Sequence, residues 1–199
     1  MVGEITELLL PDVEHWRSWL LENQATSSGV WLVLHKKGGA VTELSYAQAL
    51  DEALCFGWID GQSKSRDAES SYRRWTPRGA KSIWSVRNTE IVERLEREGR
   101  MQPAGRAAVD AAKADGRWGQ AYARSTEAEL PQDLLIAIAA NPAAQEMFEV
   151  LNAKNRFSLY FRLSQLKTEA ARQRKIAGFV EMLARHEAPH PQRAAPQGD

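Results

Sequence analysis

Apolar positions in the first third of the chain change from helical spacing to the dense pattern of a strand and back. One helix face before residue 24 carries Val13, Trp16, Trp19 and Leu20. This spacing, with Asp12 as the N-cap, predicts a helix over residues 12–24. The run VWLVLHK at 30–36 is β-branched and aromatic and stops at two glycines, which predicts a strand. Ser-Tyr-Ala-Gln at 45–48 has the form of a capping box and predicts a helix that ends near residue 57.

A hairpin and a series of helices follow. Residues 58–66 and 71–76 have the pattern of two strands joined by the polar turn DAES, although Asp60-Gly61 is a competing turn signal. From residue 88 onward the apolar spacing is helical, with glycine or proline between the segments. The helices are expected around residues 88–99, 104–115, 134–138, 147–151, 159–166 and 169–186.

This order of elements predicts an α+β protein: a small antiparallel sheet with flanking helices, followed by a C-terminal helical lobe. We expect residues 1–125 to form the α+β core and residues 126–187 to form the helical lobe packed on it. Residues 188–199 hold three prolines and lack core residues, so this tail is expected to be disordered.

The composition is that of an ordinary soluble protein, with 26 basic and 26 acidic residues among 199. The single cysteine, Cys55, excludes an intrachain disulfide and fits a reducing compartment. The N-terminal segment lacks the features of a signal peptide, and no apolar run approaches the roughly 20 residues that span a bilayer. We therefore expect a cytoplasmic protein without membrane insertion.

The charges are unevenly distributed along this neutral chain. Between residues 62 and 87 there are seven basic and two acidic residues, a net charge of +5. Residues 1–61 carry a net charge of −6, and residues 88–199 carry +1. The basic block is interleaved with tryptophans, a mixture that suits an anionic ligand, because guanidinium groups match phosphate oxygens and aromatic rings offer stacking surfaces.

Within and beside this block, strand alternation predicts that Tyr72, Arg74 and Thr76 share one face, with Arg73 and Trp75 on the other. Arg74, Arg78 and Lys81 would contact the anion, and Trp75 or Trp84 would stack or line the wall. Asp60 either binds a ligand or accepts from an arginine in a structural pair, and the pair is favoured. The candidate ligand-binding residues are Trp58, Asp60, Arg74, Trp75, Arg78, Lys81, Trp84 and Asn88. Nucleic acid is a less expected ligand, because the chain has no repeated binding module.

The sequence contains only weak matches to catalytic motifs. The string His-Glu-Ala-Pro-His at 186–190 matches H-E-x-x-H, but its proline interrupts the helix that a zinc site requires, so we interpret it as a chance match. A nucleophilic Cys55 with His35 as base is less favoured than a buried cysteine. Phosphate-binding, dinucleotide-binding and nucleophile-elbow motifs are absent from the sequence. We expect no metal and no cofactor.

Several segments together resemble one family. These are CFGWIDGQ at 55–62, TPRGAKSIWSVRN at 76–88, GRMQPAGRAAVDAAKADGRW at 99–118 and Ala121-Tyr122. With WLVLHKK and SYAQALDEAL upstream, the chain is similar to the YdeI/OmpD-associated family, also called bacteriocin-protection proteins, from about Trp16 to Tyr122. The C-terminal helices match more loosely, at Leu166-Lys167, Ala171-Arg172 and Lys175-Ile176.

The resemblance implies a small α+β bacterial protein linked to envelope stress and to resistance against bacteriocins or cationic peptides. It brings no catalytic residues. Its motif groups Trp58, Asp60, Thr76, Pro77, Arg78, Ser82, Trp84, Ser85 and Asn88. The leading hypothesis is a non-enzymatic binding or stress-response protein for an anionic ligand or a protein partner. The alternatives are an enzyme that acts on a small anionic substrate with Asp60 as acid or base, and a protein-interaction scaffold.

Overall fold

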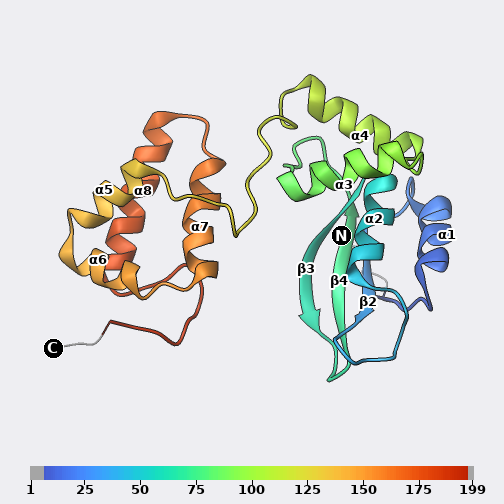
Figure 1. Ribbon diagram of the computed structural model, residues 1–199, viewed down its shortest axis with the longest axis horizontal. Helices are drawn as coiled ribbons and strands as arrows, with labels where there is room; N and C mark the ends of the chain where they lie inside the picture. The colour runs from blue at the N-terminus through green and yellow to red at the C-terminus, as the bar shows by residue number, and fades with distance from the viewer. Residues whose placement is uncertain (1–6, 197–199) are drawn as a thin grey trace. The chain divides into compact units, whose positions relative to one another are not determined.

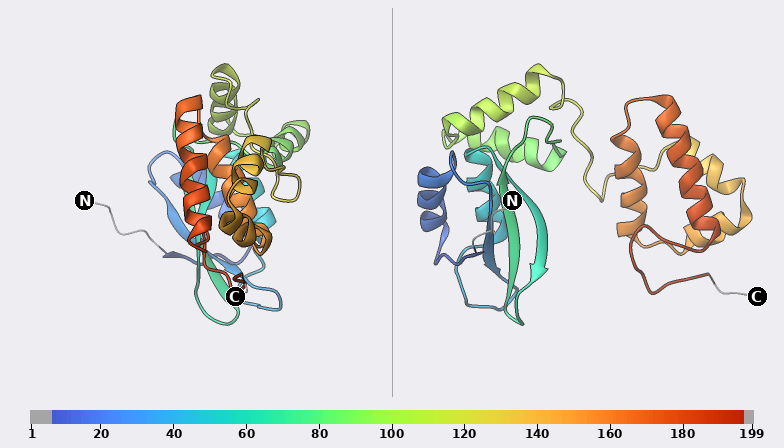
Figure 2. Two further views of the ribbon diagram at one scale, coloured as in Figure 1. Left: turned by 90° about the vertical axis from the view of Figure 1, so that its left-hand side faces the viewer. Right: turned by 180° about the vertical axis from the view of Figure 1, so that it is seen from behind.

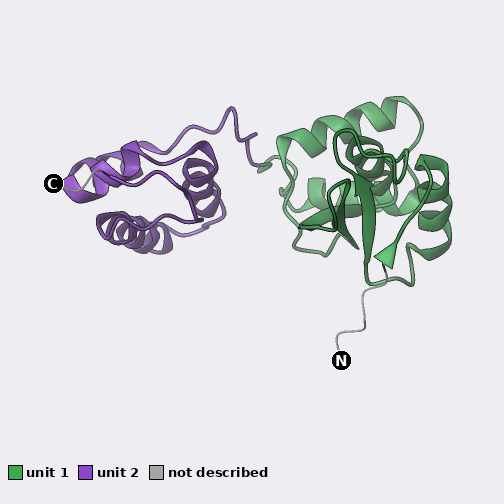
Figure 3. Cartoon of the chain, turned by 90° about the horizontal axis from the view of Figure 1, so that it is seen from below, with its two compact units in different colours: residues 1–121 green, residues 122–199 purple. Residues whose placement is uncertain are grey.

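The computed structural model describes residues 7–196, and the chain divides into two compact units, 1–121 and 122–199 (Figure 3). Each unit has its own cluster of buried apolar residues. The first unit contains a sheet with helices, and the regular elements in the described part of the second are all helices (Figure 1). The α+β class predicted from the sequence is therefore confirmed.

Unit 1 contains a four-stranded sheet in the order β1-β2-β4-β3. Its elements are β1 (Glu7–Leu8), α1 (Val13–Asn23), β2 (Val30–His35), α2 (Tyr46–Cys55), β3 (Trp58–Ser65), β4 (Ser70–Pro77), α3 (Val86–Arg97) and α4 (Pro103–Ala114). The sheet is antiparallel except where β1 pairs parallel with β2. The sequence did not predict β1, because two residues are too few to show a strand pattern.

The first two helices begin where their capping residues predict. The Asp12 side chain accepts from the backbone N–H of His15, and the Ser45–Gln48 capping box is formed at the start of α2. The buried Trp16 indole donates to the backbone oxygen of Ala49 at 3.1 Å, which joins α1 to α2. Helix α3 begins at Val86, two residues before the expected 88, because Ser85 caps it.

The β3–β4 hairpin turns at the polar segment after Ser65. The Asp67 carboxylate accepts from the backbone N–H groups of Glu69 and Ser70, at 2.9 and 2.7 Å, and from the Ser70 hydroxyl at 2.8 Å. These bonds lower the pKa of Asp67. The competing signal at Asp60-Gly61 marks no turn, because both residues lie within β3 where the register shifts.

The two faces of the sheet have different surroundings. The strand register places Trp75 and Arg73 on one face and Arg74 and Tyr72 on the other, as the alternation predicted. Helices α1 and α2 cover the first face, since the Trp16 ring lies 6.0 Å from that of Trp75. Figures 1 and 2 show both helices on the same side of the strands. We call the opposite side the open face, because no described helix of unit 1 lies over it.

Helix α4 crosses the end of α2 at very short distance. A Cβ atom added to Gly105 would lie 2.1 Å from the backbone oxygen of Cys55 and 2.9 Å from that of Leu54. Gly57 has a positive φ of 73°, and a Cβ atom added to it would lie 2.9 Å from the backbone oxygen of Ala104. Only glycine allows this approach, which brings α4 against the core of unit 1.

Unit 2 is a helical bundle. Its elements are α5 (Gln132–Ala139), α6 (Pro142–Glu149), α7 (Ala153–Ser164) and α8 (Glu169–Ala184). Helix α7 begins six residues before the predicted 159, because Asn152 caps it and accepts from the N–H of Asn155. The Arg172 guanidinium donates two hydrogen bonds to the Asp133 carboxylate, at 2.6 and 2.7 Å, and joins α8 to α5.

The segment after α8 departs from the expected disorder in its described part, residues 188–196. The fully buried Asn155 side chain accepts from the N–H of His190 at 2.8 Å and donates to its oxygen at 3.1 Å. It also donates to the Gln192 side chain at 2.7 Å. The buried Asn155 side chain on α7 thus holds in place a segment that its composition predicted to be disordered.

Candidate functional site

The tryptophans predicted to contact a ligand are core residues. Trp58, Trp75 and Trp84 are 1%, 0% and 2% exposed. Trp58 contacts the ring of Trp19 edge-on at 5.7 Å, and Trp84 lies 4.9 Å from Trp118. These rings therefore stabilise unit 1 and have no free face for stacking on a ligand.

Two further candidates hold the segment between β4 and α3. The Arg78 guanidinium lies 3.4 Å from the centroid of the Trp84 ring and donates to the backbone oxygen of Ile83 at 3.1 Å. Asn88 is buried, and its backbone N–H donates to the Ser85 side chain at the start of α3. Lys81 is exposed within the same segment. The structure thus joins Arg78 to Trp84 and leaves Lys81 at the surface.

Asp60 lies in a cluster with Tyr46, Arg73 and Arg87. Its carboxylate accepts from the Tyr46 hydroxyl at 3.0 Å and forms an ion pair with Arg73 at 3.6 Å. The guanidinium groups of Arg73 and Arg87 lie 4.9 and 5.4 Å from the centroid of the Tyr46 ring. Burial and the Asp60 charge raise the pKa of Tyr46 to about 12. Asp60 has the structural arginine pair that the sequence favoured, and its partner is Arg73.

The open face carries a different aromatic and basic cluster. Trp31 on β2 and Tyr72 on β4 lie diagonally across the two central strands, with ring centroids 6.4 Å apart at an interplanar angle of 74°. Both rings are partly exposed. Lys64 from β3 extends over the Trp31 ring, with its Nζ 4.3 Å from the centroid. Arg74 is directly opposite Trp31 in the register. We call Trp31, Lys64, Arg66, Tyr72 and Arg74 the open-face cluster.

The open-face cluster has more positive charge than its acidic neighbour neutralises. Glu7 on β1 accepts from the Tyr72 hydroxyl at 2.6 Å and forms an ion pair with Arg66 at 3.4 Å. The Tyr72 pKa is raised because its hydroxyl donates to this carboxylate. Arg74 and Lys64 form no ion pair with any residue in the described range 7–196. Among the described residues, these two cations therefore have no acidic counter-ion.

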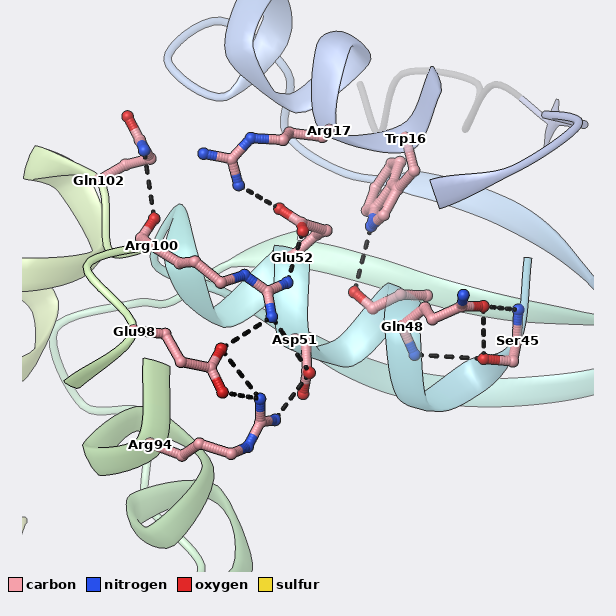
Figure 4. A network of polar contacts seen from close by, with 11 residues as sticks. Trp16, Arg17, Ser45, Gln48, Asp51, Glu52, Arg94, Glu98, Arg100 and Gln102 are labelled. Atoms are coloured by element: carbon pink, nitrogen blue, oxygen red, sulfur yellow. Dashed lines mark hydrogen bonds and ion pairs between the residues drawn. The ribbon is translucent and has the colours of Figure 1, made fainter. Parts of the chain in front are cut away.

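The largest charged network of unit 1 is fully paired. Glu52, only 4% exposed, accepts from Arg17 at 2.6 Å and from Arg100 at 2.7 Å (Figure 4). Arg94 bridges Asp51 and Glu98, and Arg100 also donates to Glu98. Three carboxylates and three guanidinium groups thus join α1, α2 and α3 to the segment that precedes α4. Such an arrangement is structural, since each acid already has its counter-ion.

The surroundings of Cys55, His35 and the His-Glu-Ala-Pro-His string differ from those of a reactive thiol or a zinc site. Cys55 is fully buried, and burial raises its pKa to about 11. The Nδ1 of His35 forms a hydrogen bond with the backbone oxygen of Thr42 at 2.9 Å. Helix α8 ends at Ala184, before the His-Glu-Ala-Pro-His string, so that string lacks the continuous helix of a zinc site. Within residues 7–196, no three His, Cys, Asp or Glu side chains group as metal ligands. No described helix is long and apolar enough to cross a membrane.

Sequence reasoning missed Trp31 as a surface residue. Its run, VWLVLHK, has the density of a buried strand, and the mixture of charge and aromatic rings pointed instead to the tryptophans in and beside the basic block. Alternation on β2 places Trp31, Val33 and His35 on the face opposite to that of Leu32 and Leu34, but it does not decide which face the helices cover.

The comparisons with known proteins match the two units separately. A model of a domain of unknown function, DUF8412, matches residues 8–108, slightly more than half of the chain. The model described as bacteriocin-protection, YdeI or OmpD-associated matches residues 127–186.

The family predicted from the sequence is confirmed, although its model matches the helical lobe rather than the stretch from Trp16 to Tyr122. No curated protein and no solved structure matches the chain. The chain therefore belongs to the DUF8412 domain family, and its residues 127–186 match the bacteriocin-protection, YdeI or OmpD-associated family.

Proposed function

We propose that this bacteriocin-protection-type protein is a non-enzymatic binding module that binds an anionic ligand on the open face of unit 1. The observation that carries the proposal is the pair of unneutralised cations, Lys64 and Arg74, beside two partly exposed aromatic rings. A cation without a counter-ion can exchange its hydration for an anion without first breaking an internal pair.

The way the cations of the basic block are paired supports a binding site on the open face. Arg73 is paired with Asp60 and Arg66 with Glu7, so these two cations contribute less to the field. Lys64 and Arg74 lie on neighbouring strands and project on the same face, which concentrates positive potential over the centre of the sheet. Lys81 lies beyond β4 and adds charge at the surface without an ion pair in the described chain.

The proposal is tested by titrating the protein with a panel of anions at two ionic strengths. The panel contains tripolyphosphate, ATP, oligodeoxythymidylate and vesicles with phosphatidylglycerol. We expect at least one of these to bind with an affinity that falls with salt, and to bind more weakly to Arg74→Gln.

Lys37→Gln is the matched control, because Lys37 is exposed and lies in the turn after β2. The same charge is lost, but away from the open-face cluster. If no anion binds, or if Arg74→Gln and Lys37→Gln bind equally well, the proposed site is wrong.

A further inference from the structure

The geometry of the open-face cluster points to a ligand with both flat rings and negative charges. Trp31 and Tyr72 are on β2 and β4, the two central strands of the sheet, and on the same face. Their rings are in edge contact at 74° rather than stacked in parallel, so each ring keeps at least one face that the other does not cover. Two adjacent aromatic platforms on the centre of a sheet can each accept a flat, unpaired ring.

We propose that the open face binds single-stranded nucleic acid, an inference that rests on the proposed function and names its ligand class. The two rings provide platforms for about two bases. Lys64 and Arg74 are placed to contact the phosphates between and beside those bases, since each is a direct or diagonal neighbour of a ring. Cations interleaved with stacking rings are the arrangement that binds single strands without sequence preference.

Lys64 has a particular role in this binding. In the free protein its Nζ lies over the Trp31 ring at 4.3 Å from the centroid. A base that stacks on Trp31 displaces the ammonium group from the ring. The flexible side chain then reaches a phosphate, and one cation–π contact is exchanged for a charge-assisted contact.

Glu7 fixes the second platform and limits where the phosphates run. Its carboxylate holds the Tyr72 hydroxyl at 2.6 Å, which restrains the ring against the sheet. Being negative, it repels phosphate at the β1 edge, whereas Lys64 and Arg74 attract it towards β3 and β4. The strand is therefore expected to follow the β4–β3 side of the open face. A compact anion such as ATP uses only one ring, and a membrane surface uses neither.

The test measures the anisotropy of a labelled oligodeoxythymidylate and an oligouridylate of about ten nucleotides, within the usual site size. The variants are Trp31→Leu and Arg74→Gln in the full chain, with Trp31→Phe as the conservative variant. Phe157→Leu is the aromatic control, because Phe157 is a partly exposed ring in unit 2. Urea unfolding followed by the fluorescence of the remaining tryptophans verifies that the unit 1 variants are folded, and far-ultraviolet circular dichroism verifies Phe157→Leu in unit 2.

We expect Trp31→Leu to weaken binding by roughly tenfold or more and Trp31→Phe to restore part of it. Arg74→Gln should reduce the slope of log affinity against log salt by about 0.7, the value for one phosphate contact on a single strand. Phe157→Leu should bind like the unchanged protein. A duplex of the same length should bind more weakly than the single strand, because its bases are already stacked.

Two results would overturn the inference while preserving the proposed function. One is oligonucleotide binding that depends on Arg74 but is equal in Trp31→Leu. The other is binding of tripolyphosphate, ATP or vesicles through Arg74 with no oligonucleotide binding. A protein that binds none of these anions would overturn both the inference and the proposed function.

Discussion

The crossing of α4 over α2 allows a sharp test of the packing in unit 1. In Gly105→Ala, the new Cβ would lie 2.1 Å from the Cys55 oxygen, 2.7 Å from its carbonyl carbon and 2.9 Å from the Leu54 oxygen. All three atoms belong to backbone, so no side-chain rotation can relieve the overlap. Helix α4 must move away from α2, and the 3.0 Å hydrogen bond from the Gln102 N–H to the Cys55 oxygen weakens with it.

The expected cost follows from three contributions. Overpacking of a close contact costs about 1–3 kcal/mol, and a weakened hydrogen bond about 1 kcal/mol. Alanine in place of glycine in a helix returns up to about 1 kcal/mol. We therefore expect Gly105→Ala to lower the free energy of unfolding of unit 1 by roughly 1–4 kcal/mol.

The assay is urea unfolding followed by tryptophan fluorescence. All seven tryptophans lie between residues 16 and 118, so this signal reports unit 1 alone. The matched control is Gly178→Ala in α8, where an added Cβ has no neighbour within 4 Å. That change should stabilise unit 2 by about 0.5–1 kcal/mol, observed by far-ultraviolet circular dichroism. If Gly105→Ala stabilises its unit to the same extent, the close approach of α4 to α2 is wrong.

Three further changes test other contacts. Glu52→Gln should lower the free energy of unfolding of unit 1 by about 3 kcal/mol, because two arginines lose a buried counter-ion. At the more exposed Glu98, the same change to Gln should cost less than about 1 kcal/mol. Urea midpoints compare the two variants, and equal costs would refute the buried network. The Cys55 pKa is raised in the folded state, so the folded protein retains a proton that the unfolded chain loses. Stability should then fall as the pH rises from 9 towards 11, less steeply in Cys55→Ala, and an unchanged slope would contradict the burial of the thiol. Asn155→Ala should make the segment around His190 easier to cleave by a protease while unit 1 stays folded. Equal cleavage rates in the variant and the unchanged protein would show that this contact does not order the segment.

Much of the fold was predictable because local signals and tertiary contacts agree. The caps Asp12 and Ser45 and the turn at Asp67 satisfy backbone groups within a few residues, so their roles can be read from the sequence. Strand β1 and the ordered segment at His190 depend on partners far along the chain, respectively Trp31 and Asn155. Long-range contacts of this kind leave no periodic signal.

The candidate site was only partly predictable for a related reason. Arg74 was correctly assigned to the face opposite Trp75, since alternation along β4 decides it. Which of the two faces the helices cover is decided by tertiary packing, and the packing of α1 and α2 buries Trp75 and Trp58. Trp58 and Trp75 are therefore core residues, and the partly exposed rings are those of Trp31 and Tyr72.

The most direct test of the open-face claim uses the tryptophan indole N–H groups as reporters in a nitrogen-15 spectrum. The unit 1 signals are recorded while oligodeoxythymidylate is added, and Trp31 is assigned by its loss in Trp31→Phe. Binding on the open face predicts that the Trp31 indole signal shifts and saturates, while those of the buried Trp58 and Trp75 stay in place. Binding that leaves the Trp31 signal unmoved would contradict the account.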